Sequence, residues 1–274
     1  MSTIVTKISP SKGWQLIDLR EVWQYKDLLY FLTVRGIKAK YAQSVLGVGW
    51  AIIQPLFQTL VFTVIFGNLA KMGSDGVPYV LFSFTAMVPW NYFSNILTNS
   101  SGSLVQNRAM LSKVYFPRLV LPISSVLSGL LDFLIAFLVL VGLLTYYQLA
   151  PNVNIIYFPL LLLILIMTSL GIGMILSAMA VQYRDVQYAM SFLVRILLYS
   201  VPVVYSISII PDQYLYWYAL NPMVGVIEGM RATFLGTRPM PWDLIGIGCA
   251  VSLVLFVFGA FYFKRMEKTF ADIA

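Results

Sequence analysis

Residues 35–67 read RGIKAKYAQSVLGVGWAIIQPLFQTLVFTVIFG, and this stretch changes character in one step. Arg35, Lys38 and Lys40 are basic and need water, whereas residues 45–69 contain no charged side chain. At a rise of about 1.5 Å per residue, about 20 apolar residues cross the ~30 Å hydrocarbon core of a bilayer. The stretch therefore predicts a basic segment at the membrane surface that leads directly into a first membrane-spanning helix.

Composition extends this prediction to the whole chain of 274 residues. Hydrophobic residues make up 59% of the chain and charged residues only 11%, against roughly 25% charged residues in a typical soluble domain. These proportions indicate an all-α polytopic membrane protein.

One cysteine and no histidine limit the chemistry that the chain can perform. A single thiol cannot form a disulfide within the chain, and a zinc, haem or copper site is not expected. We therefore expect neither a metal nor a cofactor in this chain. The net charge is +7, but the basic residues flank apolar runs instead of forming one patch, which argues against a nucleic-acid partner.

The apolar runs predict six membrane-spanning helices, at residues 45–69, 80–97, 123–146, 155–180, 188–204 and 244–263. Residues 21–40 combine apolar side chains at roughly helical spacing with one charged face. This pattern favours a helix lying in the membrane interface, and an amphipathic helix packed on a soluble partner is the alternative. The predicted organisation is a tail with an interfacial helix (1–44), a six-span domain (45–263) and a second tail (264–274).

The distribution of basic residues predicts the orientation. Six spans place both termini on one side of the membrane. Of the 18 lysines and arginines, fourteen lie in the two tails and in the connecting segments on that side, and three lie in the opposite loops. Because lysine and arginine accumulate in cytoplasmic loops, we predict a multi-pass protein of the cytoplasmic (inner) membrane with both termini cytoplasmic.

No catalytic motif is present. The sequence contains neither a GxxxxGK[ST] phosphate-binding loop nor a nucleophile motif, and its polar segments are too short for a catalytic domain. We therefore do not expect an enzyme, although an enzyme that uses carboxylates alone at the membrane is the alternative.

The cytoplasmic segment 98–122 is short, basic and partly apolar. This pattern favours a helix that docks into a groove on a partner, and the alternative is a solvated loop whose charges only set the topology. The candidate docking residues are Leu104, Asn107, Arg108, Met110, Leu111 and Lys113.

The external segment 205–241 predicts short helices between spans five and six. Asn221 followed by Pro222 is a helix-start signal, and Glu228 and Arg231 are three residues apart, so they can pair on that helix. Aromatic residues precede it, and they fit either an interfacial belt or half-buried re-entrant helices that close an exit and stack on sugar rings. The candidate gate residues are Tyr214, Trp217, Tyr218, Asn221, Glu228 and Arg231.

Polar residues inside the spans are candidates for a substrate path. Gln54 and Gln58 lie in the first span, and a lipid-facing helix would avoid them. Asp132 and Arg195 are charged residues within spans three and five. Either they neutralise each other or Arg195 reaches the cytoplasmic surface, or Arg195 lies on the wall of a pathway and faces an anionic substrate group.

Five blocks in order resemble the permease subunits of ABC-2-type polysaccharide exporters, which include O-antigen, capsule and teichoic acid exporters. These blocks are KAKYAQSVLGVGWAIIQPLFQTLVFTVIFG, LVQNRAMLSKVYFPRLVLP, SAMAVQYRDVQYAMSFLVRILLYSVPVVYSISIIP, YALNPMVGVIEGMRATFLG and RMEKTFADIA. The resemblance covers nearly the whole chain and is strongest to the O-antigen type. Gly36, in place of an acidic residue, and Arg195, in place of an uncharged one, depart from the pattern.

The resemblance implies a homodimer of six-span permeases that binds two copies of a separate ATPase subunit through segment 98–122. That subunit would bind ATP and Mg²⁺, and the permease would move an undecaprenyl-diphosphate-linked polysaccharide outward through a channel lined by spans one and five. The expected channel-lining residues are Gln54, Phe57, Gln58, Phe62, Arg195, Tyr199 and Tyr205. A permease for a small lipid or drug, a membrane-embedded glycan-processing enzyme and a structural scaffold are the alternatives.

Overall fold

The computed structural model describes residues 19–273, which form helices and loops without a β-strand. Residues 1–18, which belong to the predicted N-terminal tail, and residue 274 lie outside the described part. The elements in chain order are α1 (Leu19–Gln24), α2 (Lys26–Tyr41), η1 (Gly47–Gly49), α3 (Trp50–Phe62), η2 (Thr63–Leu69), α4 (Tyr79–Gln106), α5 (Arg108–Leu111), α6 (Val120–Tyr146), η3 (Val153–Tyr157), α7 (Phe158–Gln182), α8 (Asp185–Leu197), η4 (Leu198–Ser200), η5 (Ile207–Ile209), α9 (Asp212–Ala219), α10 (Pro222–Phe234) and α11 (Trp242–Ile273).

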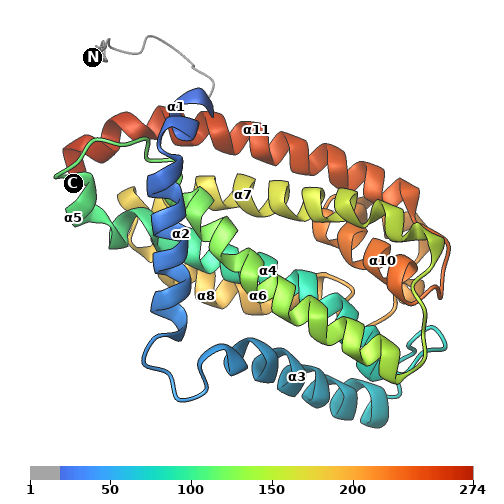
Figure 1. The fold of residues 1–274 in the computed structure, drawn as a ribbon. Coiled ribbons are helices and arrows are strands. Elements are labelled where there is room, and N and C mark those ends of the chain that lie inside the picture. The colour runs from blue at the N-terminus through green and yellow to red at the C-terminus, as the bar shows by residue number, and fades with distance from the viewer. Residues whose placement is uncertain (1–18, 274) are drawn as a thin grey trace.

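Four long helices, α4, α6, α7 and α11, form a bundle, and α3 lies on its outer side (Figure 1). Helix α2 crosses one end of this bundle at a steep angle and packs on α6. Helices α1, α2 and α5 and the C-terminal part of α11 lie at this end, which is called the α5 end below. Helix α10 and the loop before α11 lie at the opposite end, called the α10 end.

Among the described residues, four segments are long and apolar enough to cross a membrane, namely residues 47–69, 120–146, 153–182 and 242–267. They correspond to the predicted spans one, three, four and six, so the chain is a polytopic helical membrane protein, as the sequence predicts. The count of six spans stays a prediction, because neither α4 nor α8 is among these segments.

Helix α4 has the length of a span but not its hydropathy. Its 28 residues extend about 42 Å at about 1.5 Å per residue, and most of them are buried. It packs against α3, α6, α7, α8 and α10, so most of its side chains contact protein instead of lipid. The sequence analysis ended this span at residue 97, whereas the helix continues to Gln106; there Ser103 Oγ lies 2.9 Å from Ser177 Oγ of α7.

Helix α8 is too short to span a membrane alone. Its 13 residues extend about 20 Å at about 1.5 Å per residue, and η4 follows it directly. Val201 is extended because it precedes Pro202, and the proline ring disfavours helical backbone at the residue before it. The predicted span 188–204 is therefore helical only in its first part.

Aromatic stacking and close backbone contact hold the bundle together. The Phe137 and Phe158 rings stack 4.9 Å apart, and each meets Phe234 of α10 at 5.4 Å, which joins α6, α7 and α10. Gly171 and Gly259 let α7 and α11 touch through their backbones, since a Cβ on Gly171 would lie 2.7 Å from Phe256 N. Small residues at such crossings permit close packing in membranes.

The predicted interfacial segment forms α1 and α2, separated at Tyr25. Leu32 is buried, whereas Tyr30 and Phe31 remain exposed. The segment is therefore helical with one face covered, and the covering element is α6 of the same chain.

Candidate functional site

A cavity of about 330 Å³ lies between α3, α4, α6 and α8 and is called the α3–α8 cavity. Gln54 and Gln58, one helical turn apart on α3, line it, and so does Arg195 of α8. The structure thus brings together three of the predicted channel-lining residues from two distant parts of the chain. Trp50 and Trp90 also line the cavity, so its wall combines amide, aromatic and cationic surface.

The other predicted channel residues lie outside this cavity. Phe57 is exposed on the outer face of α3, and Phe62 is buried in the apolar core with its ring 5.7 Å from that of Phe66. Tyr199 is exposed in η4. The Tyr205 hydroxyl lies 3.1 Å from the Tyr199 carbonyl oxygen and 2.7 Å from the Tyr218 hydroxyl, which links η4 to α9.

Asp132 and Arg195 both line the α3–α8 cavity but do not pair with each other. Asp132 forms an ion pair with Lys40 and accepts a hydrogen bond from the Tyr41 hydroxyl. The last turn of α2 reaches over α6 and supplies both partners. The hypothesis of mutual neutralisation is therefore wrong, and no carboxylate in residues 20–267, whose side chains the structure describes, forms an ion pair with Arg195.

The sequence analysis missed a row of asparagines on α4. Asn91 and Asn95 line the α3–α8 cavity, and Asn99 lines a second cavity, described next. These residues are spaced by four and therefore lie on one face of the helix. Amides recurring at helical spacing in an apolar run are a signal that could have revealed them.

The second cavity has a volume of about 490 Å³, lies between α2, α4 and α6, and is called the α2–α6 cavity. Half of its lining residues carry an amide or a hydroxyl, and two cations, Arg35 and Lys40, come from α2. Lys40, Asn95 and Asp132 line both cavities, so the two meet at the Lys40–Asp132 ion pair.

The predicted docking residues lie at the α5 end. Arg108 and Lys113 are exposed, whereas Met110 and Leu111 are half-buried and pack against a cluster of apolar residues. Leu104 is 1% exposed, so it belongs to the core of this chain and is not free to contact a partner. Asn107 accepts a hydrogen bond from Arg35 Nη1 at 3.4 Å and donates one to Ser103 O at 2.8 Å, which ties α5 to α2 and α4.

Tyr115 follows α5 and is largely exposed. Its hydroxyl donates to Glu21 Oε1 at 3.0 Å. Partial burial and this hydrogen bond to a carboxylate raise the pKa of Tyr115. The contact fixes α1 against the segment that follows α5.

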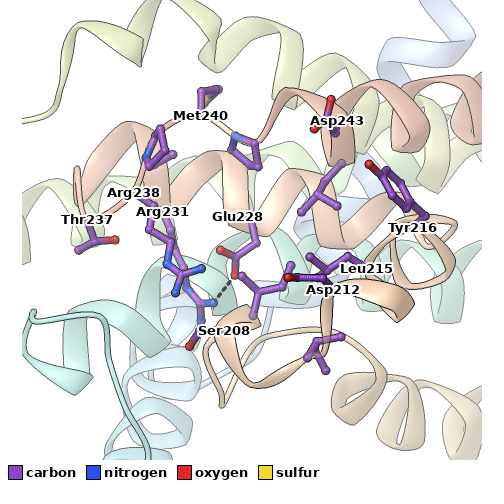
Figure 2. A pocket seen from close by; sticks show the side chains of 16 residues that line it. Ser208, Asp212, Leu215, Tyr216, Glu228, Arg231, Thr237, Arg238, Met240 and Asp243 are labelled. Atoms are coloured by element: carbon purple, nitrogen blue, oxygen red, sulfur yellow. Dashed lines mark hydrogen bonds and ion pairs between the residues drawn. The ribbon is translucent and has the colours of Figure 1, made fainter.

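The predicted gate residues lie at the α10 end, where Figure 2 shows the Glu228 carboxylate pointing toward the Arg231 guanidinium. Glu228 Oε1 and Arg231 Nη1 are 2.7 Å apart, and both side chains are almost fully buried. Arg231 Nη2 also donates to Val203 O at 3.0 Å, and its guanidinium lies 3.5 Å from the centre of the Phe82 ring. The predicted pairing is confirmed. Through its contacts with Phe82 and Val203, Arg231 joins α10 to α4 and to the segment after η4.

A cavity of about 640 Å³ adjoins this ion pair and is lined by side chains of α9, α10 and the loop before α11 (Figure 2). A second ion pair, Asp75 Oδ1 to Arg238 Nη2 at 3.3 Å, lies nearby. Ser206 Oγ donates to Asp75 at 2.8 Å, so the turn before α4 is held against two later loops.

Asn221 has the predicted capping role, since its side chain accepts a hydrogen bond from Met223 N at 3.1 Å and Pro222 opens α10. Tyr214 and Trp217 are exposed on α9, and Tyr218 is half-buried.

In residues 19–267 no cluster of histidine, cysteine, aspartate or glutamate has the arrangement of a metal site.

Comparison with known proteins places this arrangement in a family. Residues 27–235 match the family model described as ABC-2 type transporter. The chain is 31% identical over 256 residues to the O-antigen export system permease protein RfbA of Myxococcus xanthus, covering 93% of this chain and 98% of that protein. It is 28% identical over 248 residues to the protein of the same name from Klebsiella pneumoniae, covering 90% and 95%. It is 27% identical over 205 residues to the polysialic acid transport protein KpsM of Escherichia coli, covering 73% and 78%.

Proposed function

Because the chain belongs to the ABC-2 type transporter family, we propose that it is the membrane subunit of an ATP-driven polysaccharide exporter. Its substrate is an O-antigen-like polysaccharide linked to undecaprenyl diphosphate, which crosses the inner membrane outward. The similarity to two O-antigen export permeases over at least nine tenths of this chain supports this choice of substrate.

The α3–α8 cavity carries the proposal. Gln54 and Gln58 offer amides that exchange hydrogen bonds with sugar hydroxyls, and Arg195 offers a cation that no carboxylate in the described residues neutralises. A guanidinium presents a planar fork that fits phosphate oxygens and stays charged when partly desolvated. Such a wall suits a polar chain that is linked to an anionic carrier better than it suits an apolar drug.

The chain works with partners. Two copies form the channel, and two copies of a separate ATPase subunit bind at the α5 end and supply ATP and Mg²⁺. Exposed Arg108 and Lys113 and half-buried Met110 and Leu111 support a docking surface there. The end of α11 and helix α1 lie at this same end, which supports a cytoplasmic position for both termini (Figure 1). The basic residues of the sequence favour the same orientation.

The α10 end then faces outward, and α9 and α10 form the gate. The buried Glu228–Arg231 pair fixes α10 to α4, while the exposed aromatic residues Tyr214 and Trp217 of α9 lie where a sugar chain would leave. Stacking on aromatic faces lets a polymer slide without a fixed register, whereas deep polar pockets would hold it.

Deletion and complementation test the function. Cells that lack this chain should accumulate lipid-linked polysaccharide on the cytoplasmic side, and the wild-type chain should restore surface polysaccharide. Restoration should also require an active ATPase partner, for which a hydrolysis-deficient ATPase is the control. If surface polysaccharide is unchanged in the deletion strain while a small lipid or drug accumulates, the proposed substrate is wrong.

A further inference from the structure

The α2–α6 cavity is distinct from the α3–α8 cavity, and its three helices each contribute a row of residues spaced by four. Helix α2 contributes Leu32, Gly36 and Lys40, α4 contributes Asn95, Asn99 and Ser103, and α6 contributes Ser124, Ser128 and Asp132. Residues spaced by four lie on one face of a helix, so each helix turns a single stripe toward the cavity. From Asn91 to Gln106 the polar stripe of α4 extends about 22 Å at about 1.5 Å per residue.

The charges of this cavity favour an anion. Arg35 and Lys40 are its two cations, and Asp132 is its only carboxylate among the described residues. Arg35 Nη1 donates to the neutral Asn107 Oδ1 at 3.4 Å, and no carboxylate within residues 20–267 forms an ion pair with it. One positive charge therefore remains uncompensated in a wall of amides and hydroxyls.

The ion pair at the inner end of the cavity can exchange partners. Asp132 has two donors, the Lys40 ammonium group and the Tyr41 hydroxyl. If Lys40 turns toward an anion, Asp132 keeps the hydrogen bond from Tyr41, so no buried carboxylate loses every partner. Because Lys40 and Asp132 line both cavities, this exchange takes place at the boundary between them.

We propose that the α2–α6 cavity binds the phosphate-bearing, glycosylated headgroup of a membrane lipid before it reaches the α3–α8 cavity. Arg35 and Lys40 bind the phosphate, and the amides and hydroxyls of α4 and α6 bind the first sugar. The Lys40 ammonium group then leaves Asp132 and binds the phosphate. This exchange of partners joins the two cavities along the polar stripe of α4. This inference rests on the proposed function only for the statement that the bound lipid is the exported substrate.

Ser125 offers a substitution that tests the site. It lies on α6, is half-buried and lines the α2–α6 cavity, whose volume of about 490 Å³ leaves room for a longer side chain. Ser125→Asp is therefore expected to fold, and it adds a second carboxylate to the wall of the cavity. Asn99→Leu removes an amide from α4 instead and so tests the same cavity from another helix.

Binding is measured on the purified full chain in nanodiscs of phosphatidylcholine. The probe is a radiolabelled polyprenyl diphosphate that carries one N-acetylhexosamine. Phosphatidylglycerol and inorganic diphosphate are the competitors. Gln43→Asp is the matched control, because it adds the same charge at an exposed position just after α2 that lines neither cavity. Copurification of the ATPase subunit reports on folding.

The wild-type chain and Gln43→Asp should bind the probe equally well. Ser125→Asp and Asn99→Leu should each weaken binding about tenfold or more while they still copurify the ATPase. Equal binding by Ser125→Asp and Gln43→Asp would overturn the inference. Displacement of the probe by phosphatidylglycerol at equal concentration would also overturn it, since the site would then select any anionic lipid.

Export in complemented cells separates this inference from the proposed function. If the wild-type chain fails to restore surface polysaccharide, the proposed function fails, whatever the binding data show. If the wild-type chain restores export and Ser125→Asp keeps both export and binding, only the role of the α2–α6 cavity is refuted.

Discussion

Replacing Glu228 with Gln tests whether the buried ion pair holds the α10 end together. Glu228 and Arg231 are 2.7 Å apart, and both side chains are 5% exposed or less. The substitution keeps the shape of the side chain but removes the negative charge. Arg231 then keeps the carbonyl of Val203 and the Phe82 ring as partners, and loses the one carboxylate that forms an ion pair with it in the described part of the chain.

Removing one partner of a buried ion pair typically costs about 3–5 kcal/mol, because an uncompensated charge remains in the interior. Since Arg231 keeps its other partners, we expect the lower end, about 3 kcal/mol, which corresponds to a fall in Tm of about 6–12 °C for a chain of this size. The matched control is Asp75→Asn, which removes the charge from a 3.3 Å pair whose arginine is 36% exposed. That pair should contribute less than about 1 kcal/mol.

The assay is thermal unfolding of the purified chain in detergent, followed by intrinsic fluorescence. The double variant Glu228→Gln with Arg231→Met removes both charges and should recover part of the lost Tm, since an uncharged pair leaves no buried ion. If Glu228→Gln lowers Tm no more than Asp75→Asn does, the buried pair does not stabilise α10 as argued.

Substitutions at three further sites test the remaining contacts. Arg195→Lys keeps the charge but loses the planar fork, so polysaccharide export should fall partly and Arg195→Gln should reduce it further; full export by Arg195→Gln would exclude the phosphate role. Replacing Met110 and Leu111 together with Asp places charge in the proposed docking surface, so the ATPase should no longer copurify although the chain still inserts; undiminished copurification would contradict this. Gly259→Leu pushes a side chain into the backbone of α7 at Gly171, which should destabilise the chain by about 2–3 kcal/mol, and an unchanged Tm would show that the two helices can separate freely.

Features set by neighbouring residues were predictable from the sequence. Asn221 caps α10 because its side chain reaches the backbone two residues later, and Glu228 meets Arg231 because residues three apart are adjacent on a helix. Both geometries follow from helical spacing alone. The full burial of the ion pair was not predictable, since it depends on Phe82 and on other residues far away in the sequence.

The partner of Asp132 was not predictable for the same reason. The sequence analysis considered Arg195, the other charged residue inside a predicted span, as the partner of Asp132. It treated Lys40 as part of the segment at the membrane surface. The structure folds α2 back over α6, and Lys40 reaches Asp132 across 92 positions of the chain. Charge and hydropathy identify which residues need partners, but the path of the chain between them decides which partner each one meets.

The predicted end of span two shows why the mean hydropathy over a stretch of residues loses information about the individual positions. Asn95, Thr98, Asn99 and Ser100 lower the mean hydropathy, so the sequence analysis ended the span at residue 97, yet α4 continues to Gln106. A helix satisfies its own backbone hydrogen bonds, so polar side chains do not end it when neighbouring helices or a cavity receive them. Because Asn91, Asn95 and Asn99 recur every four residues, they fall on one face, whereas the residues of a solvated loop would show no such period. A test for polar residues that recur every four positions, applied beside the hydropathy average, would separate a helix that borders a hydrated path from a loop. The same test would find the row Ser124, Ser128 and Asp132 on α6.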